Sequence, residues 1–346
     1  MTPTEKPHTQ RPLIGLTPGQ LTTLATEECG MPRYAGEQIA DWLYVKRVTE
    51  IDQMTNLSKK HRELLTQKFC VGRYAPAQKQ CSADGTIKYL FAIGDSFVET
   101  VYIPEDDRAT LCVSSQVGCK MNCLFCMTGK QGFGAHLTAH EIVNQILSIP
   151  ESNTLTNIVY MGMGEPLDNV EQVLQSIECL THPQGLAWSP KRITVSTIGV
   201  EPGLSTFLEK SRCHLAVSLH NPIPLERREI MPVEGGVPIH KVLETIGKYD
   251  FEHQRRLTFE YIVFSGLNDT RKHMNALVDL LRDLPCRVNL IRYHRIPEID
   301  LPASDMERME RMRDFLTAQG ITTTIRTSRG EDILAACGML SSQQQR

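Results

Sequence analysis

The spacing of apolar and polar positions divides the chain into regions of different periodicity. Over about the first seventy residues, apolar positions recur at helical spacing, as in AGEQIADWLYVK. Thr17 precedes Pro18, and Asn56 or Ser58 precedes a later helical run, and all three are residue types that cap helices. The pattern predicts a small all-helical unit, an N-terminal accessory domain over 1–72.

The next stretch has the period of a strand. IKYLFAIGDSFVETVYIP, residues 87–104, alternates apolar and polar positions and is rich in β-branched and aromatic side chains. Gly94 and Asp95 interrupt it near its middle, where a tight turn is expected. We therefore predict a β-hairpin linker over 73–104.

From about residue 108, strand-like and helix-like runs alternate. One helix is expected to begin at Thr138, which can form a capping box with Glu141. The alternation is typical of a parallel sheet curled into a full or partial α/β barrel, in which chemistry collects at the C-terminal ends of the strands. We expect this core over 105–340, followed by a tail over 341–346. The seven candidate strands are ATLCVSS, TNIVYMG, RITVSTI, HLAVSLH, LTFEYIVF, RVNLIRY and TTTIRT.

Composition narrows the class of protein. The 346 residues are 41% hydrophobic with a formal net charge of −3, which suits a globular protein and argues against a general polyanion binder. Eleven cysteines in a chain of this length suggest reduced thiols rather than a disulfide scaffold. The start, MTPTEKPHTQRP, lacks the apolar core of a secretory signal, and no run of eighteen apolar residues occurs. We expect a cytoplasmic protein without a membrane span.

Three cysteines follow the first barrel strand in C-x3-C-x2-C spacing: Cys119, Cys123 and Cys126. Thiolates bind zinc or iron–sulfur clusters. Structural zinc usually takes two separate pairs of ligands, although His136 or His140 could here complete a site. Three thiolates on a four-iron cluster would instead leave one iron without a protein ligand, which suits catalysis.

At this point the sequence resembles a known family. The cysteine spacing after the first strand of a barrel resembles the radical S-adenosylmethionine (SAM) enzymes. Within them, CVSSQVGCKMNCLFCMTGKQGF, MGMGEPLDN, RITVSTIG, AVSLHNP and RGEDILAACG resemble, in this order, the RlmN family of adenine C2-methyltransferases. The resemblance extends from the N-terminal unit to Gly338. It implies an α/β fold, a partial (β/α)6-type radical SAM barrel with a small N-terminal helical accessory domain and a β-hairpin extension.

The resemblance also implies the ligands. Cys119, Cys123 and Cys126 would hold a [4Fe–4S] cluster, and SAM would bind at the strand ends. His294 departs from the family, which often has asparagine there, but histidine can likewise donate or accept a hydrogen bond. The positions that match the SAM-binding residues of the family are Gly164, Glu165, Ser196, Ser218, Leu219, His220 and His294.

Three further residues acquire roles only through the resemblance. Adenine C2 is not nucleophilic, so Cys337 would first take a methyl group from one SAM, and a second SAM would supply the adenosyl radical that activates this methyl for addition to C2. Cys112 would then release the product by forming a transient disulfide with Cys337. Glu99 would take the C2 proton. By sequence alone, Glu99 looks like a solvated strand residue and Cys337 like a small buried one.

The implied partners are 23S rRNA and tRNA, together with a one-electron donor of flavodoxin or ferredoxin type, and we expect a monomer. Lys59-Lys60-His61-Arg62 predicts an RNA-docking surface on the N-terminal unit. The nearest alternative is adenine C8 methylation, as in the related Cfr family. A non-catalytic iron–sulfur or zinc protein that binds RNA, or an activase that makes a glycyl radical on a partner, would have no use for Cys112 and Cys337 together.

Overall fold

The computed structural model describes residues 10–251, 253, 255–296 and 299–341. The chain forms two compact units. The first contains the chain up to Ala75 with 138–152 and 171–189, and the second contains 76–137, 153–170 and the chain from Pro190 onward. Two helices from the middle of the chain thus pack with the N-terminal helices, a grouping that the boundaries expected from the sequence do not follow. Of the predicted tail, only Ser341 lies within the described residues.

The first unit is mainly helical, as the apolar spacing predicts. Thr17 caps its first helix, and Ser58 rather than Asn56 caps the third, because the Ser58 hydroxyl accepts from the His61 N–H. The prediction of an all-helical unit is wrong in one respect, since two short strands pair in parallel, and strands of two residues carry no readable period. The elements are β1 (Arg11–Pro12), α1 (Pro18–Thr23), α2 (Tyr34–Ala40), α3 (Lys59–Lys68), β2 (Phe69–Cys70), α5 (Ala139–Leu147) and α6 (Val170–Thr181).

All seven predicted barrel strands form in the second unit and run parallel in chain order. Among the described residues, they are part of a ten-stranded sheet. The first and last strands of this sheet do not pair with each other, so the barrel is open. The strands are β6 (Ala109–Cys112), β9 (Asn157–Tyr160), β10 (Ile193–Thr197), β11 (His214–Ser218), β12 (Leu257–Val263), β13 (Cys286–Arg292) and β14 (Thr322–Arg326).

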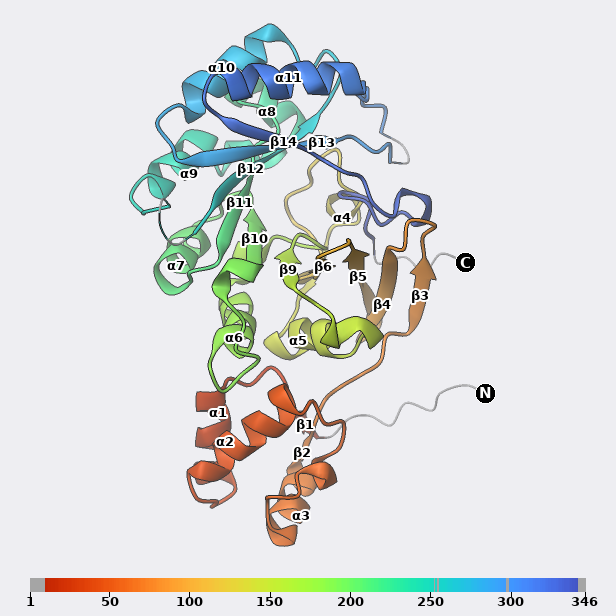
Figure 1. Ribbon diagram of the computed structural model, residues 1–346, viewed down its shortest axis with the longest axis vertical. Coiled ribbons are helices and arrows are strands. Elements are labelled where there is room, and N and C mark those ends of the chain that lie inside the picture. The colour runs from red at the N-terminus through yellow and green to blue at the C-terminus, as the bar shows by residue number, and fades with distance from the viewer. Residues whose placement is uncertain (1–9, 252, 254, 297–298, 342–346) are drawn as a thin grey trace. The chain divides into compact units, whose positions relative to one another are not determined.

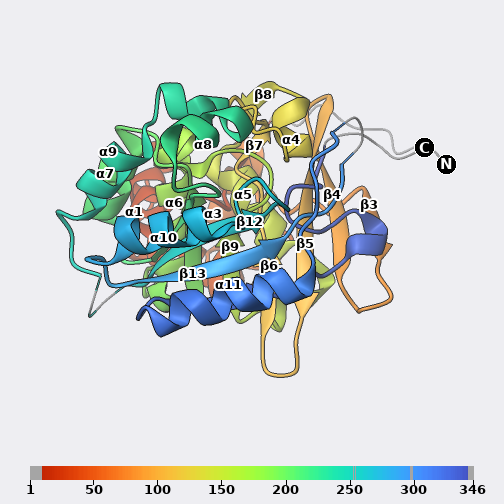
Figure 2. The ribbon, with the colours of Figure 1, turned by 90° about the horizontal axis from the view of Figure 1, so that it is seen from above.

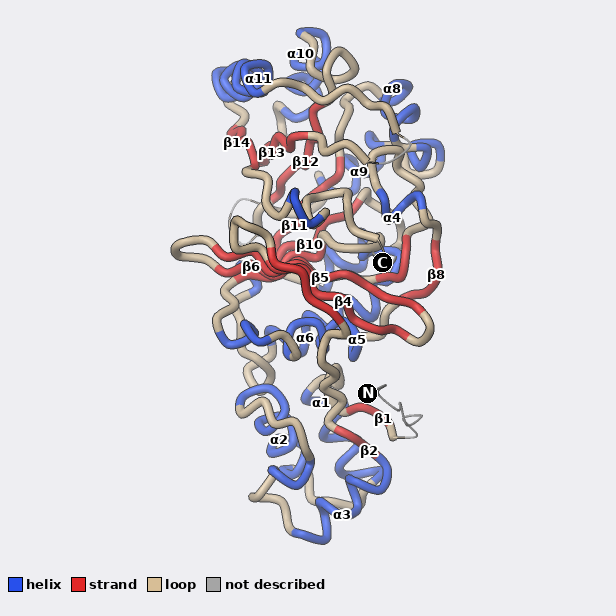
Figure 3. The backbone as a smooth tube through the Cα atoms, turned by 90° about the vertical axis from the view of Figure 1, so that its right-hand side faces the viewer, coloured by secondary structure: helices blue, strands red, loops and turns tan. Residues whose placement is uncertain are grey.

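The predicted hairpin continues this sheet on the other side of β6 (Figure 3). It consists of β4 (Ile87–Ile93) and β5 (Ser96–Pro104), joined at Gly94, whose φ of +55° suits glycine. A further edge strand, β3 (Gln78–Cys81), pairs with β4. Sequence reasoning missed β3 because three of the four residues in QKQC are polar, which leaves no apolar alternation.

Five of the remaining helices of the second unit, α7 to α11, lie beside strands β10 to β14, and α4 lies near β7 and β8 (Figures 1 and 2). Since all seven barrel strands are parallel, their C-terminal ends lie along one edge, from which the loops of the candidate site emerge. No helix of the described chain is both long and apolar enough to cross a membrane. The other elements are β7 (Gln116–Gly118), α4 (Met127–Lys130), β8 (Phe133–His136), α7 (Gly203–Lys210), α8 (Pro224–Ile230), α9 (Ile239–Ile246), α10 (Arg271–Leu281) and α11 (Met306–Ala318).

Candidate active site

The three motif cysteines lie on the loop between β7 and α4, and backbone hydrogen bonds fix this loop at both ends. The Cys119 N–H donates to the Gly132 carbonyl at 2.9 Å, and the Leu124 N–H donates to the Ile230 carbonyl at 2.9 Å. Gly118 has φ +72°, and a Cβ there would lie 1.7 Å from the Gly132 oxygen. Only glycine therefore fits at the start of the loop.

The three thiols line one cavity of about 160 Å³. Burial raises the pKa of Cys119 to about 12 and also raises the pKa values of Cys123 and Cys126. Cys126 and Cys119 raise the pKa of Cys123 further, because like charges that lie close together repel. The three sulfur atoms are thus close enough to share one cationic group, which would favour their thiolate forms.

The donor set fits an iron–sulfur cluster better than a single zinc ion. Among the described residues, no group of three or more histidine, cysteine and carboxylate side chains is arranged to hold one metal ion. His136 and His140, the possible fourth zinc ligands, belong to no such group. A cubane cluster binds each cysteine through a different iron, so its thiolates stand further apart than those around one ion. Three thiols on one cavity wall meet that requirement.

Most of the predicted SAM-binding residues line this smaller cavity too. They emerge from the ends of β9, β10 and β11, so the parallel sheet brings them to one edge. Two do not line it: Leu219 is fully buried, and His294 lines a second, larger cavity. Those on the smaller cavity are Gly164, Glu165, Ser196, Ser218 and His220.

Glu165 is held from several sides within the protein. Its carboxylate accepts from the Leu167 N–H at 3.0 Å, the Ile198 N–H at 3.0 Å and the Thr197 hydroxyl at 2.5 Å. Burial raises the pKa of Glu165 to about 7, and these hydrogen bonds act against that rise. Glu165 thereby ties the ends of β9 and β10 together, and a contact with SAM stays a prediction.

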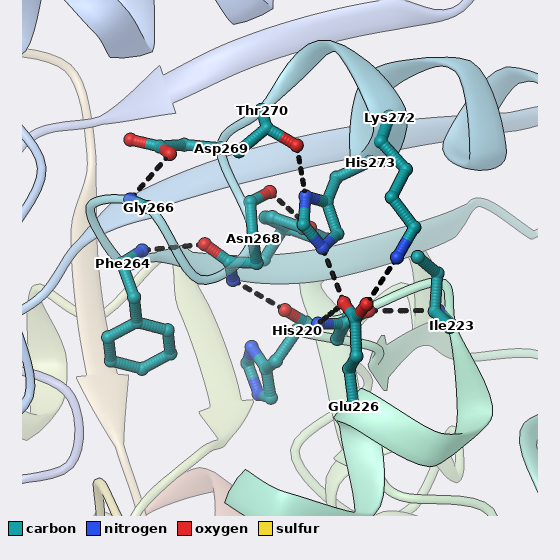
Figure 4. Close-up of polar contacts among 12 residues, drawn as sticks. His220, Ile223, Glu226, Phe264, Gly266, Asn268, Asp269, Thr270, Lys272 and His273 are labelled. Atoms are coloured by element: carbon teal, nitrogen blue, oxygen red, sulfur yellow. Dashed lines mark hydrogen bonds and ion pairs between the residues drawn. The ribbon is translucent and has the colours of Figure 1, made fainter.

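His220 is held in a strained but well-supported conformation (Figure 4). Its φ is +54°, which is uncommon for a residue with a side chain. The Asn268 amide donates to the His220 carbonyl at 2.6 Å and accepts from the Phe264 N–H at 2.7 Å. The His220 ring accepts from the Ile262 N–H at 3.0 Å, while burial and nearby Arg227 lower its pKa to about 3. The ring is therefore neutral at physiological pH.

The predicted catalytic cysteines lie close enough to influence each other electrostatically, with Cys337 beside the cysteine loop. The C-terminal segment docks there, since the Met127 N–H donates to the Gly338 carbonyl at 2.8 Å and the Thr128 hydroxyl donates to the Leu340 carbonyl at 2.7 Å. Cys337 consequently lines both the smaller and the larger cavity. Burial raises the pKa of Cys112 to about 12, and the neighbouring Cys337 adds to this rise. The two thiols are 225 positions apart in the sequence (337 − 112), and this mutual effect shows that they are close in space.

Two charged residues that line both cavities were not among the site residues predicted from the sequence. Arg326, at the end of β14, lines both cavities, and the charge of Cys337 raises its pKa. Glu260, within β12, also lines both cavities and is 5% exposed. The signal for Glu260 was present in LTFEYIVF, where one carboxylate interrupts an apolar strand.

Glu99 is buried, so its sequence-based description as a solvated strand residue is wrong. Its carboxylate pairs with the buried Lys88 ammonium at 2.9 Å and accepts from the Ser341 N–H at 2.9 Å. Burial raises the pKa of Glu99, and Lys88 opposes that rise. Sequence alone could not show this, because the Lys88 partner lies on the neighbouring strand and both side chains face inward.

Two family models match the chain. The radical SAM superfamily matches residues 113–281, and the ribosomal RNA large subunit methyltransferase N-terminal domain matches residues 12–71. The first match includes the cysteine loop and the ends of β9, β10 and β11. The second lies within the helical first unit.

Full-length relatives agree with these matches. The "Probable dual-specificity RNA methyltransferase RlmN" of Parabacteroides distasonis is 61% identical, over 96% of this chain and 97% of its own. The "Dual-specificity RNA methyltransferase RlmN" of Desulfotalea psychrophila is 40% identical, over 96% and 95%. A crystal structure of a radical SAM methyltransferase from Sphaerobacter thermophilus superposes with a TM-score of 0.89 at 38% identity, covering 96% of this chain and 100% of that one. The chain therefore belongs to the RlmN family of dual-specificity RNA methyltransferases, within the radical SAM superfamily.

Proposed function

We propose that the protein methylates C2 of an adenine in 23S rRNA and of an adenine in the anticodon loop of tRNA, with Cys337 as the methyl carrier. Membership of the RlmN family supports the reaction class and the RNA substrates. The observation that carries the proposal is the position of Cys337, on the wall common to both cavities and beside Cys112. A thiol there faces two ligand sites at once.

The cofactors of the superfamily are a [4Fe–4S] cluster and SAM. Cys119, Cys123 and Cys126 would hold the cluster, and Gly164, Ser196 and Ser218 on the same cavity would contact SAM. When bound, these groups supply a transferable methyl group and, by one-electron cleavage, a radical that abstracts hydrogen. The buried apolar side chains beside the loop, among them Phe125 and Met231, would exclude water from that chemistry.

Three residues of the chain carry out the remaining steps, which are methyl acceptance, proton removal and product release. A thiolate is nucleophilic where adenine C2 is not, so the Cys337 sulfur accepts the methyl group. Once this carbon is joined to C2, Glu99 accepts the C2 proton, and the one unpaired electron of the adduct would pass to an iron–sulfur acceptor, which leaves a closed-shell thioether. Cys112 then attacks the Cys337 sulfur: the S–S bond forms, the bond from sulfur to carbon breaks, and the released carbon takes the electron pair and a proton to become the product methyl.

Intact mass after incubation with SAM tests the methyl carrier. We expect a 14 Da adduct (one CH2 added) on the anaerobically reconstituted wild-type protein and none on Cys337→Ala, because alanine has no sulfur to accept a methyl group. Cys179→Ala, which removes another buried thiol, should keep the adduct. Absence of the adduct from wild-type protein that carries its cluster would refute the proposed role of Cys337.

Adenine C8 methylation is the less favoured activity. The relatives that match nearly the whole chain carry the RlmN name. The two methylated adenosines are isomers of equal mass, so chromatography of the digested RNA against both standards distinguishes them. A C8 product would overturn the assignment of position but not that of the methyl carrier.

The helical first unit is proposed to dock the RNA. Lys59 and Lys60 begin α3 with exposed side chains, and the match to an rRNA methyltransferase N-terminal domain covers them. Changing both lysines to glutamate should lower tRNA affinity about 10-fold at low salt, because phosphate contacts are electrostatic. A filter-binding titration measures this, with Lys210→Glu/Lys248→Glu, two exposed positions elsewhere, as the matched control. Equal affinities for the two variants would exclude this surface.

The remaining partners are proposed on chemical grounds. A flavodoxin-like or ferredoxin-like protein would supply single electrons to the cluster. We propose a monomer, and analytical ultracentrifugation would detect any other state. A cytoplasmic location follows from the proposed RNA substrates, and fractionation of cells would test it.

A further inference from the structure

Glu260 holds a carboxylate oxygen that no residue of the described chain satisfies. The side chain is 5% exposed, and its Oε1 accepts from the Asn289 amide at 2.9 Å. Its Oε2 is buried and has no hydrogen-bond partner among the described residues. A buried oxygen left without a donor costs roughly 1–3 kcal/mol, and more when the group is charged. The charge of nearby Arg326 favours the ionised carboxylate, and a ligand that donates a hydrogen bond to Oε2 would remove the remaining cost.

Neighbouring strands hold Glu260 in place from one side. Glu260, Asn289 and Thr324 face one another in register across β12, β13 and β14. The Thr324 hydroxyl donates to the Asn289 oxygen at 2.7 Å, which leaves the Asn289 amide group to donate to Glu260. Asn289 and Thr324 line the larger cavity and not the smaller one. Asn289 and Thr324 therefore belong to the larger cavity, and Glu260 lies where that cavity meets the smaller one.

The larger cavity suits a nucleotide. Its volume is about 610 Å³, within the usual range for sites of small organic ligands. Burial and the nearby Arg256 lower the pKa of His214 to about 4, so this ring is neutral at pH 7. Cations outnumber carboxylates on the wall, which favours an anionic ligand. Arg326 and Arg329, at the C-terminal end of β14, lie on the side of the active-site loops, and the other four cations lie at the N-terminal ends of their strands. The cations are Arg108, Lys191, Arg256, Arg287, Arg326 and Arg329, and the carboxylates are Glu105 and Glu260.

We propose that the larger cavity receives the target adenine, and that Glu260 Oε2 accepts a hydrogen bond from the exocyclic amino group of this base. This inference rests on the RNA methyltransferase activity proposed above. Adenine presents an amino donor at C6, where guanine presents a carbonyl oxygen that a carboxylate would repel. The amino group and C2 lie on either side of N1, so a bond to the amino group orients C2 as well. Cys337 lies on the wall of the same cavity. Glu260 thus selects the base and positions its reacting carbon.

The test compares two RNA hairpins, one with adenosine and one with purine riboside, which lacks the amino group, at the target position. Wild-type protein should methylate the purine hairpin about 10- to 100-fold more slowly, the usual effect of losing one hydrogen bond to a charged group. Glu260→Ala should methylate the adenosine hairpin more slowly by a similar factor and lose the preference between hairpins. Glu260→Gln keeps an acceptor oxygen and should retain part of the preference.

Methylation of Cys337 by SAM alone, read as the 14 Da adduct, reports on each variant without RNA. Glu260→Ala should form this adduct at the wild-type rate, which also shows that it is folded. Glu310→Ala, an exposed carboxylate on α11, is the matched control and should keep the hairpin preference.

Three other results would each be decisive. A full hairpin preference in Glu260→Ala would overturn the inference. Loss of the Cys337 adduct from a Glu260→Ala protein with wild-type circular dichroism and melting temperature would also overturn it, because that result would assign Glu260 to SAM. A wild-type protein that forms neither adduct nor C2 product would instead refute the proposed function.

Discussion

Cys112→Ala protein will accumulate RNA covalently joined to Cys337 in place of free methylated product. The adduct can be released only by a nucleophile that reaches the Cys337 sulfur. Cys337 raises the pKa of two thiols, Cys112 and Cys126, and Cys126 is assigned to the cluster, so Cys112 is the candidate nucleophile. We expect C2-methylated product to fall at least 100-fold while Cys337 still takes up its first methyl group. Denaturing electrophoresis of the reaction with radiolabelled RNA measures the joined species.

The control for this variant is Cys179→Ala, which removes a thiol of the first unit that is equally hidden from solvent and should leave product formation intact. Product released at the wild-type rate from Cys112→Ala would show that another group resolves the adduct. Cys81, which is exposed, would be the next thiol to test.

The same step gives wild-type protein a defined pH dependence. Burial raises the pKa of Cys112 to about 12, Cys337 adds to the rise, and Arg326 opposes it. The thiolate is the attacking form, so between pH 7 and 9 its fraction grows about 10-fold per pH unit. Release of product in a single turnover should therefore accelerate as pH rises. A release rate independent of pH over this range would mean that deprotonation of Cys112 does not limit the step.

Glu99→Gln will block product formation at a different stage. Glutamine preserves the shape and can still accept from Lys88, but it cannot take up a proton from C2. Loss of a general base commonly costs 10²- to 10⁴-fold in rate. We expect a loss of that size in C2-methylated RNA with an unchanged 14 Da adduct on Cys337, because methyl uptake does not use Glu99. Single-turnover assays with mass analysis of protein and RNA measure both.

The Lys88→Met variant distinguishes a role of Glu99 as a general base from a purely structural role. It removes the 2.9 Å ion pair but keeps the carboxylate, whose pKa should rise further without the cation. A folded Lys88→Met protein, judged by its Cys337 adduct, should retain far more product formation than Glu99→Gln. Equal losses in the two variants would assign Glu99 a structural role only, through Lys88 and Ser341.

The sequence by itself determined the longer elements of the fold, although not the short strands β1, β2 and β3. The seven barrel strands and the hairpin at Gly94 follow from local periodicity and turn residues. The caps at Thr17, Ser58 and Thr138 follow from the residues at the helix starts. The cysteine spacing identified the cluster loop for a similar reason, since its three residues are neighbours in the chain. Interactions over a few residues leave such local patterns.

Tertiary structure alone decided which distant groups meet. It buried Lys88 with Glu99, brought Arg326 and Cys112 to Cys337, and left Glu260 with an unsatisfied oxygen. It also placed His294 on the larger cavity rather than the smaller one, and packed α5 and α6 with the N-terminal helices. The side chain of a charged residue looks the same in sequence whether it is solvated or buried. Its protonation and its partners depend on burial and on contacts across hundreds of residues, which only the folded chain defines.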